Sequence, residues 1–297
     1  MKKTAVASIL LFSFLFAFSF AGVTYAETAI TAFVSILPQA YFLERVGGSH
    51  VHTEVLVGEG QSPATYEPSP QQMARLSSAK VYFAIGVPFE KNLLKKINQS
   101  YKKLVVVETQ KGVTYHYLEN HHHDHDTKNN GTHHGRTPDP HIWMDPNMVK
   151  VQATNICDAL CKLDPANTGD YSKNLQLFIV DLDNTDKRIR AALAPVKGKN
   201  MYVFHPAFGY FAHSYDLHQI PIEIEGKEPS PKQLADLIDK AKKDKVRVIF
   251  VQPQFSTKSA ESIAREIGGA VVPINPLARD YLDNLSRAAS MVEKGLR

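Results

Sequence analysis

Residues 170–193 read DYSKNLQLFIVDLDNTDKRIRAAL, and this stretch decides the organisation of the chain. Apolar side chains recur in it mostly at helical spacing. They are Leu175, Phe178, Ile179, Leu182 and Ile189. A helix from about residue 166 to residue 193 would be about 42 Å long, which exceeds the width of a small lobe. We therefore predict one unbroken helix over residues 166–195 that joins two lobes. Two shorter helices divided near Asp183 are the alternative.

Strand-like and helix-like runs alternate on both sides of this helix. The strand-like runs before it are ITAFVSI (30–36), VHTEVLV (51–57), KVYFAIG (80–86) and KLVVVET (103–109). Those after it are MYVF (201–204), IPIEIEG (220–226), VRVIFVQP (246–253) and AVVPI (270–274). This alternation is typical of parallel sheets with crossover helices. We predict two similar α/β lobes, the N-terminal one over residues 27–165 and the C-terminal one over residues 196–297.

Residues 1–26 have the features of an export signal. Two lysines precede an apolar run from about Ile9 to Phe20, and small residues surround the end of the segment at Ala26. The run is shorter than the roughly 20 residues of a membrane-spanning helix, so we predict cleavage after Ala26. No cysteine lies near that position, and a lipid anchor is therefore not expected. We expect a periplasmic protein.

Charge and cysteine content exclude some classes of partner. Without Lys2 and Lys3 the formal net charge falls from +4 to +2, and no dense basic stripe is present, so we expect no nucleic-acid binding. Cys157 and Cys161 are four residues apart in a predicted helix. A disulfide along one helix is awkward, and two cysteines supply too few ligands for zinc. We interpret both as core residues.

A histidine-rich stretch occupies residues 116–134. Seven of the thirteen histidines lie there, among Asn, Gly, Thr and Lys residues and with almost no apolar side chains. Such a composition predicts a solvated loop with several weak metal sites. The histidines expected to capture metal in this loop are His116, His121, His122, His123, His125, His133 and His134.

Two further histidines stand among prolines and aromatic residues. His141 lies within DPHIWMDP (139–146), and His205 directly follows the strand-like run MYVF. Asp280 follows the last predicted strand. Open α/β sheets place ligand-binding groups at the carboxyl ends of their strands, so we predict that these three side chains meet in the cleft between the lobes. Two imidazoles and one carboxylate suit Zn²⁺, whereas Mn²⁺ or Fe²⁺ is less favoured by nitrogen ligands.

Each of these residues has an alternative interpretation. His141 or His205 could be a hydrogen-bonded core residue, and Asp280 could cap the helix that follows it. We interpret the histidines at positions 50, 52, 213 and 218 as surface or structural residues. We assign Glu223, Glu225 and Glu228 to a solvated edge and loop.

Six motifs along the chain resemble, in order, those of the zinc/manganese-type solute-binding proteins of ABC importers. They are TYEPSP (65–70), DPHIWMDP (139–146), FHPAFGYFA (204–212), EGKEPSP (225–231), IFVQPQFSTKSAESIAREIG (249–268) and NPLARDYLDNL (275–285). The resemblance implies two α/β lobes bridged by a long helix, with a metal buried between them. It also implies that the metal is delivered to an ABC-type permease in the inner membrane. We expect a monomer that is not an enzyme.

The resemblance leaves one ligand position unfilled. The family commonly uses three histidines and one carboxylate, and His141, His205 and Asp280 match three of these positions. Ala64 stands where the family usually has the first histidine. A water molecule could fill the fourth position, a histidine of the loop could reach it, or the site could have degenerated. We favour the first two explanations because every other site motif is present.

Other functions use the same residues. Three protein ligands and a water are also the plan of a catalytic zinc site, but the chain has no His-Glu-x-x-His helix, and a hydrolase is therefore the weaker hypothesis. A receptor for Mn²⁺ or Fe²⁺ and a metal-buffering chaperone remain alternatives.

Overall fold

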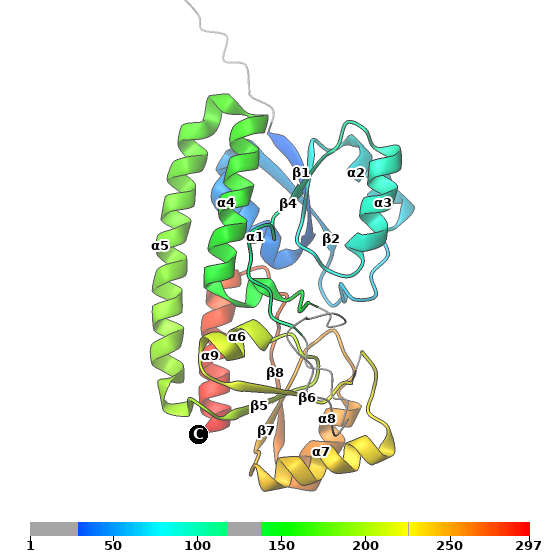
Figure 1. Cartoon of the computed structure of the whole chain (residues 1–297), viewed down its shortest axis with the longest axis vertical. Coiled ribbons are helices and arrows are strands. Elements are labelled where there is room, and N and C mark those ends of the chain that lie inside the picture. Colours follow the sequence, from blue (N-terminus) through cyan, green and yellow to red (C-terminus); the bar gives the residue numbers. More distant parts are fainter. Residues whose placement is uncertain (1–28, 118–137, 225) are drawn as a thin grey trace, which may run out of the picture.

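The structure is a computed structural model that describes residues 29–117, 138–224 and 226–297. The proposed export signal at residues 1–26 and six of the seven loop histidines lie outside this part of the chain. Two parallel sheets lie one above the other along the long axis of the molecule (Figure 1). The N-terminal sheet has the strand order β2-β1-β3-β4. Its strands are β1 (Ile30–Ile36), β2 (Val51–Val57), β3 (Val81–Ala84) and β4 (Val105–Glu108).

Helices cover both faces of the N-terminal sheet. Two of them, α1 (Leu37–Gly47) and α4 (Pro146–Leu163), lie on the side of the long helix, and α2 (Pro70–Ser78) and α3 (Glu90–Ser100) lie on the other side (Figure 1). Helix α2 begins with a capping box in which the Ser69 hydroxyl accepts from the Gln72 backbone N–H. Phe33, Val34 and Phe83 are fully buried between these layers.

The C-terminal sheet repeats the same topology, with the strand order β6-β5-β7-β8. Its strands are β5 (Asn200–Val203), β6 (His218–Pro221), β7 (Val248–Val251) and β8 (Ala270–Pro273). The helices of this lobe are α6 (Gly209–Ser214), α7 (Pro231–Lys243), α8 (Lys258–Ile267) and α9 (Tyr281–Leu296). The structure therefore confirms two similar parallel α/β lobes.

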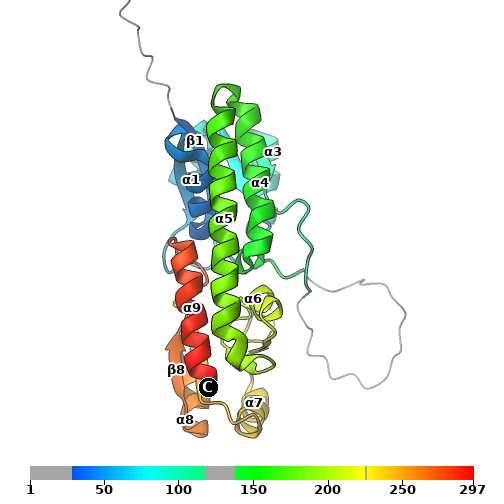
Figure 2. The ribbon, with the colours of Figure 1, turned by 90° about the vertical axis from the view of Figure 1, so that its left-hand side faces the viewer.

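The long helix α5 (Thr168–Leu193) is continuous, so the alternative of two shorter helices is wrong. It lies beside α4 in the N-terminal half of the molecule and beside α9 in the C-terminal half (Figure 2). Its buried residues form a single stripe because they recur every three to four positions, or after two full turns. They are Tyr171, Phe178, Leu182, Thr185, Ile189 and Leu193.

Aromatic side chains make the core continuous between the lobes. The Phe178 ring of α5 lies 6.0 Å from the Phe42 ring of α1, measured between centroids. The Phe42 ring in turn meets the Tyr281 ring of α9 edge-on at 4.8 Å. Burial of aromatic rings removes large apolar areas from water and is strongly stabilising. These contacts therefore hold the two lobes together on the side of α5.

The two cysteines of the chain both lie on α4. Cys157 and Cys161 are free thiols with their sulfur atoms 3.9 Å apart, and Cys157 is buried in the core. Among the described helices, none is long and apolar enough to cross a membrane.

Replacing Phe178 by alanine tests the role of α5 as the common support of both lobes. Phe178 is fully buried, so we expect Phe178→Ala to lower the free energy of unfolding by about 3–5 kcal/mol. Leu177, its neighbour on α5, is 55% exposed, and Leu177→Ala should change stability by less than about 0.5 kcal/mol. Urea unfolding of both variants measures the difference, and equal losses would contradict this assignment.

Candidate metal centre

A cavity of about 1740 Å³ lies between the lobes, where the carboxyl ends of strands from both sheets converge. The N-terminal lobe contributes Gly86, which follows β3, and Gln110, which follows β4. The C-terminal lobe contributes His205 after β5 and Glu223 after β6. His141 also lines this cavity, so the structure brings His141 and His205 together as the strand-end argument predicts.

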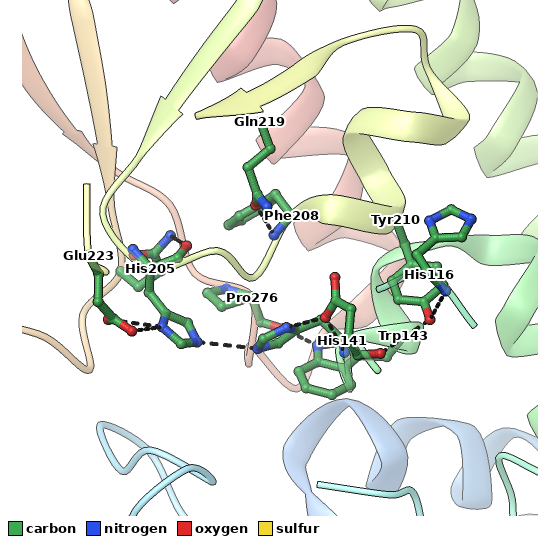
Figure 3. A network of polar contacts seen from close by, with 11 residues as sticks. His116, His141, Trp143, His205, Phe208, Tyr210, Gln219, Glu223 and Pro276 are labelled. Atoms are coloured by element: carbon green, nitrogen blue, oxygen red, sulfur yellow. Dashed lines mark hydrogen bonds and ion pairs between the residues drawn. The ribbon is translucent and has the colours of Figure 1, made fainter. Parts of the chain in front are cut away.

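A buried carboxylate fixes the position of His141. One oxygen of Asp139, Oδ1, accepts from the backbone N–H of His141 at 2.9 Å and lies 2.6 Å from the ring nitrogen Nδ1 (Figure 3). Asp139 is only 2% exposed. The Trp143 ring packs edge-on against the imidazole, with centroids 5.2 Å apart. These contacts leave the other ring nitrogen, Nε2, directed into the cavity.

His205 is fixed in the same manner from the C-terminal lobe. Its backbone N–H donates to the Gln252 side chain at 2.9 Å, and the Gln252 amide donates back to the His205 carbonyl at 3.1 Å. The Phe255 ring stacks on the imidazole at 4.5 Å. Nδ1 of His205 lies 3.0 and 3.1 Å from the two carboxylate oxygens of Glu223 (Figure 3).

The assignment of Glu223 to a solvated edge is wrong. The alternating run IPIEIEG predicts a strand over residues 220–226 with its glutamates in water, but β6 ends at Pro221. The backbone N–H of Glu223 donates to the Phe204 carbonyl at 3.0 Å, which brings the side chain onto His205 and leaves it 6% exposed. Glu228 is exposed as expected, and Glu225 lies outside the described residues.

The two imidazoles face each other through their Nε2 atoms, which are 3.3 Å apart (Figure 3). A carboxylate accepts hydrogen bonds and cannot donate them, so Nδ1 of each ring carries its proton. Each neutral ring then directs the lone pair of Nε2 at the other ring. Two lone pairs at this distance repel unless a proton or a metal cation lies between them. In a tetrahedral zinc site, two Zn–N bonds of about 2.0–2.1 Å place their nitrogens about 3.3–3.4 Å apart.

Burial also favours the neutral form of His205. Burial of the His205 ring lowers the pKa of the imidazole, and the hydrogen bond to Glu223 opposes that shift. A lowered pKa keeps the ring neutral at neutral pH, which is the form that binds a metal. Protons therefore compete with a metal for Nε2 of His205 only at pH values below the usual histidine pKa of about 6.5.

The structure does not bring Asp280 to the two imidazoles. Its carboxylate is about half exposed and lies 2.5 Å from Nη2 of Arg287, two turns further along α9. It does not cap α9 through its side chain. Asp280 lines a neighbouring recess that shares Gln254 and Leu277 with the main cavity. Among the described residues, no group of three or more histidine, cysteine, aspartate or glutamate side chains surrounds one point as a metal site would.

Ala64 lines the same cavity as His141 and His205. Its side chain is exposed, and its backbone N–H donates to the Ser62 hydroxyl at 3.3 Å. An alanine methyl group cannot bind a metal, so the Ala64 side chain provides no ligand. The position where the family usually has its first histidine is thus open to the cavity.

His116 lies where the predicted loop begins, and it is packed rather than fully solvated. Its ring stacks on Tyr210 at 4.5 Å and meets the His213 ring edge-on at 4.4 Å. Its backbone N–H donates to the Tyr210 hydroxyl at 3.0 Å. Burial, and then the nearby His213, lowers the pKa of His116. The loop histidines at positions 121, 122, 123, 125, 133 and 134 lie outside the described residues.

The other histidines stand apart from this pair. Nε2 of His50 lies 3.0 Å from the Asp170 carboxylate, which is a structural contact between the N-terminal lobe and α5. His52 and His218 are exposed. His213 is exposed as well, and both His213 and His218 line the cavity.

Two α/β lobes on a common long helix, with a pair of fixed imidazoles in the cavity between them, define a two-lobed binding protein for a small ligand. A family profile described as "Zinc-uptake complex component A periplasmic" matches residues 33–295. The chain therefore belongs to the family of periplasmic A components of zinc-uptake complexes.

Solved structures and a curated relative agree with this family. A crystal structure of ZnuA aligns with a TM-score of 0.83 at 40% identity, covering 91% of this chain and 100% of that one. A zinc-bound deletion mutant of ZnuA aligns with a TM-score of 0.82 at 40% identity and covers 90% of this chain and 98% of its own. The high-affinity zinc uptake system protein ZnuA of Bacillus subtilis (strain 168) is 30% identical over 249 residues, 81% of this chain and 76% of that protein.

These relationships confirm the resemblance inferred from the six motifs. A component of an uptake complex is a binding protein for transport, which confirms the expectation that the chain is not an enzyme. The family name also gives the compartment in general terms, as periplasmic.

The pKa of His205 should respond to its carboxylate partner. Glu223 raises this pKa against the effect of burial, so Glu223→Gln should lower it further and favour the neutral ring. Titration of the His205 ring protons by NMR measures the shift. Glu228→Gln, at an exposed position after the same strand, is the matched control and should leave the pKa of His205 unchanged. A rise in the Glu223 variant would contradict the assigned contact.

Proposed function

We propose that this protein captures Zn²⁺ between His141 and His205 and delivers it to an ABC-type importer. The observation that carries the proposal is the 3.3 Å separation of the two Nε2 atoms, with a carboxylate behind each ring. This separation suits two ligands of one tetrahedral zinc ion. The zinc named in the family description and in the zinc-bound ZnuA structure supports the same choice of metal.

The two outer carboxylates prepare the site for a cation. Asp139 and Glu223 hold the rings in one orientation and one tautomer, and they increase the basicity of the Nε2 atoms. Both carboxylates are almost fully buried, so their negative charge acts in a medium where electrostatic attraction is stronger than in water. A divalent cation placed between the rings would balance that charge. Because the inner ligands are nitrogens, Zn²⁺ is favoured over Mn²⁺.

Asp280 is the third ligand in this proposal, although its carboxylate pairs with Arg287 in the structure. Its recess and the main cavity share Gln254 and Leu277, so the carboxylate would have to leave Arg287 and turn past these residues. A water molecule or a histidine of the loop would take the fourth position, on the side of Ala64.

The histidine-rich loop collects metal and raises its concentration near the cavity. The packing of His116 against Tyr210 supports this part of the proposal, because it fixes the start of the loop at the cavity wall. The composition of this stretch predicts a solvated loop, and ordering such a loop around a metal would cost conformational entropy, so we expect its sites to be weaker than the fixed one.

We also propose that the protein is exported by a signal cleaved after Ala26, carries no lipid anchor and acts as a monomer. Its partner would be the permease of the importer in the inner membrane. The mass of the protein isolated from the periplasm tests the cleavage, because a mature chain would begin at Glu27 without added lipid. Co-purification of the zinc-loaded protein with the permease tests the partner.

Removing one imidazole should abolish tight zinc binding. We expect His205→Ala to weaken zinc affinity by more than the roughly 100-fold that loss of an outer hydrogen-bond partner can cause, because a direct ligand is lost. His52→Ala removes an exposed histidine from β2, outside the cavity, and is the matched control. Asp280→Ala should also weaken binding if that side chain joins the site. Calorimetry with a competing chelator measures all three, and unchanged affinity in His205→Ala would refute the proposed centre.

Deleting residues 118–134 separates the loop from the fixed centre. This deletion retains His116, which packs against Tyr210. We expect one tight zinc equivalent to remain and the weaker equivalents to disappear. Calorimetric titration counts both classes of site. Loss of the tight equivalent would instead show that a histidine of the loop supplies a ligand next to Ala64.

A further inference from the structure

The first residue of α6 lies unusually close to the carboxylate that holds His141. A Cβ atom built on Gly209 would lie 2.6 Å from Oδ2 of Asp139, closer than real side chains approach. The next residue contacts Asp139 as well, because the Tyr210 hydroxyl donates to the Asp139 carbonyl at 3.2 Å (Figure 3). Two consecutive residues of the C-terminal lobe therefore enclose Asp139.

Asp139 cannot turn away from Gly209 without releasing His141. Its other oxygen, Oδ1, accepts from the backbone N–H of His141 at 2.9 Å and lies 2.6 Å from Nδ1 of the ring. Rotating the carboxylate would lengthen both hydrogen bonds. The space that Gly209 leaves is thus the space that Asp139 needs in order to orient the imidazole.

Helix α6 cannot retreat either. The backbone N–H of Phe208, just before α6, donates to the Gln219 side chain at 2.7 Å. Phe208 and Phe211 are fully buried. At the end of the helix, the Ser214 hydroxyl donates to the Asp145 carboxylate at 2.8 Å. A side chain at position 209 would therefore displace the Asp139 carboxylate more readily than it would displace the helix.

We propose that Gly209 is a positioning residue for zinc capture. The absence of a side chain at this position lets α6 of the C-terminal lobe close on Asp139, which in turn holds Nε2 of His141 toward His205. The inference rests on the proposed function, because zinc affinity is the property that Gly209 would control. It also explains why the glycine lies within the run FHPAFGYFA, four residues after His205.

The first test compares Gly209→Ala with Gly169→Ala in the full chain. A Cβ at Gly169 meets no atom within 4 Å, so this variant is the matched control. Displacing an outer hydrogen-bond partner typically costs about 10–100-fold in metal affinity, and we expect Gly209→Ala to bind Zn²⁺ at least about 10-fold more weakly than the parent. Competition with a chelator measures the affinity. Unchanged affinity in Gly209→Ala would overturn the proposal.

A second test separates positioning from a general loss of stability. In an Asp139→Ala background the carboxylate is gone, so adding Gly209→Ala should cause no further loss of zinc affinity. A further loss in the double variant would show that Gly209 acts by another route and would overturn the proposal. This comparison holds even if Gly209→Ala alone folds poorly, because the double variant has no clash.

The imidazole itself provides a readout that a structural defect elsewhere would not change. In the parent, the Nδ1 proton of His141 should give a hydrogen-bonded NMR signal, and this signal should shift or disappear in Gly209→Ala but persist in Gly169→Ala. A retained signal in Gly209→Ala would overturn the proposal. If the parent fails to bind Zn²⁺ while the signal behaves as expected, the proposed function fails and the positioning contact stands.

Discussion

Two imidazoles held from behind by buried carboxylates are the interaction on which the site depends. Asp139 and Glu223 can only accept hydrogen bonds, so they fix the protons of His141 and His205 on Nδ1. The same contacts direct two lone pairs at each other across 3.3 Å. That arrangement is unfavourable for neutral rings alone and favourable around a cation. A pair built in this way is therefore prepared for a positively charged ligand before any ligand arrives.

The fold supplies the rigidity that this pair requires. The segment that carries His141 is attached to the C-terminal lobe, since the Trp143 indole donates to the Pro276 carbonyl at 2.8 Å and the Tyr281 hydroxyl donates to the Trp143 carbonyl at 2.7 Å. Both lobes also pack on α5. His141 and His205 thus keep their separation through direct contacts between the lobes. Small errors in that separation matter because metal–nitrogen bonds tolerate only a few tenths of an ångström.

Local patterns in the sequence predict the fold far better than they predict the surroundings of the site. Apolar periodicity predicts β1, β2 and α5 because the spacing of apolar residues within a segment depends on the conformation of that segment alone. His141 and His205 can be selected as candidate ligands because each stands among prolines and aromatic residues. Glu223 is misassigned, because alternation predicts a longer strand and cannot show that the chain turns after Pro221 to reach His205, 18 residues away. The end of β8 likewise predicts the edge of the sheet at which Asp280 lies, but it does not predict the direction of the Asp280 side chain.

The relative strength of contacts indicates which part of the site can move. The lobes share a continuous core that includes Phe42, Phe178 and Tyr281, and opening it would expose large aromatic surfaces at a cost of several kcal/mol. The Asp280–Arg287 pair is about half exposed, and exposed ion pairs contribute only about 0–1 kcal/mol. If Asp280 is the third ligand, turning its carboxylate toward the imidazoles is far less costly than moving a lobe. Metal capture would then depend on a side chain that changes partner within a fixed frame.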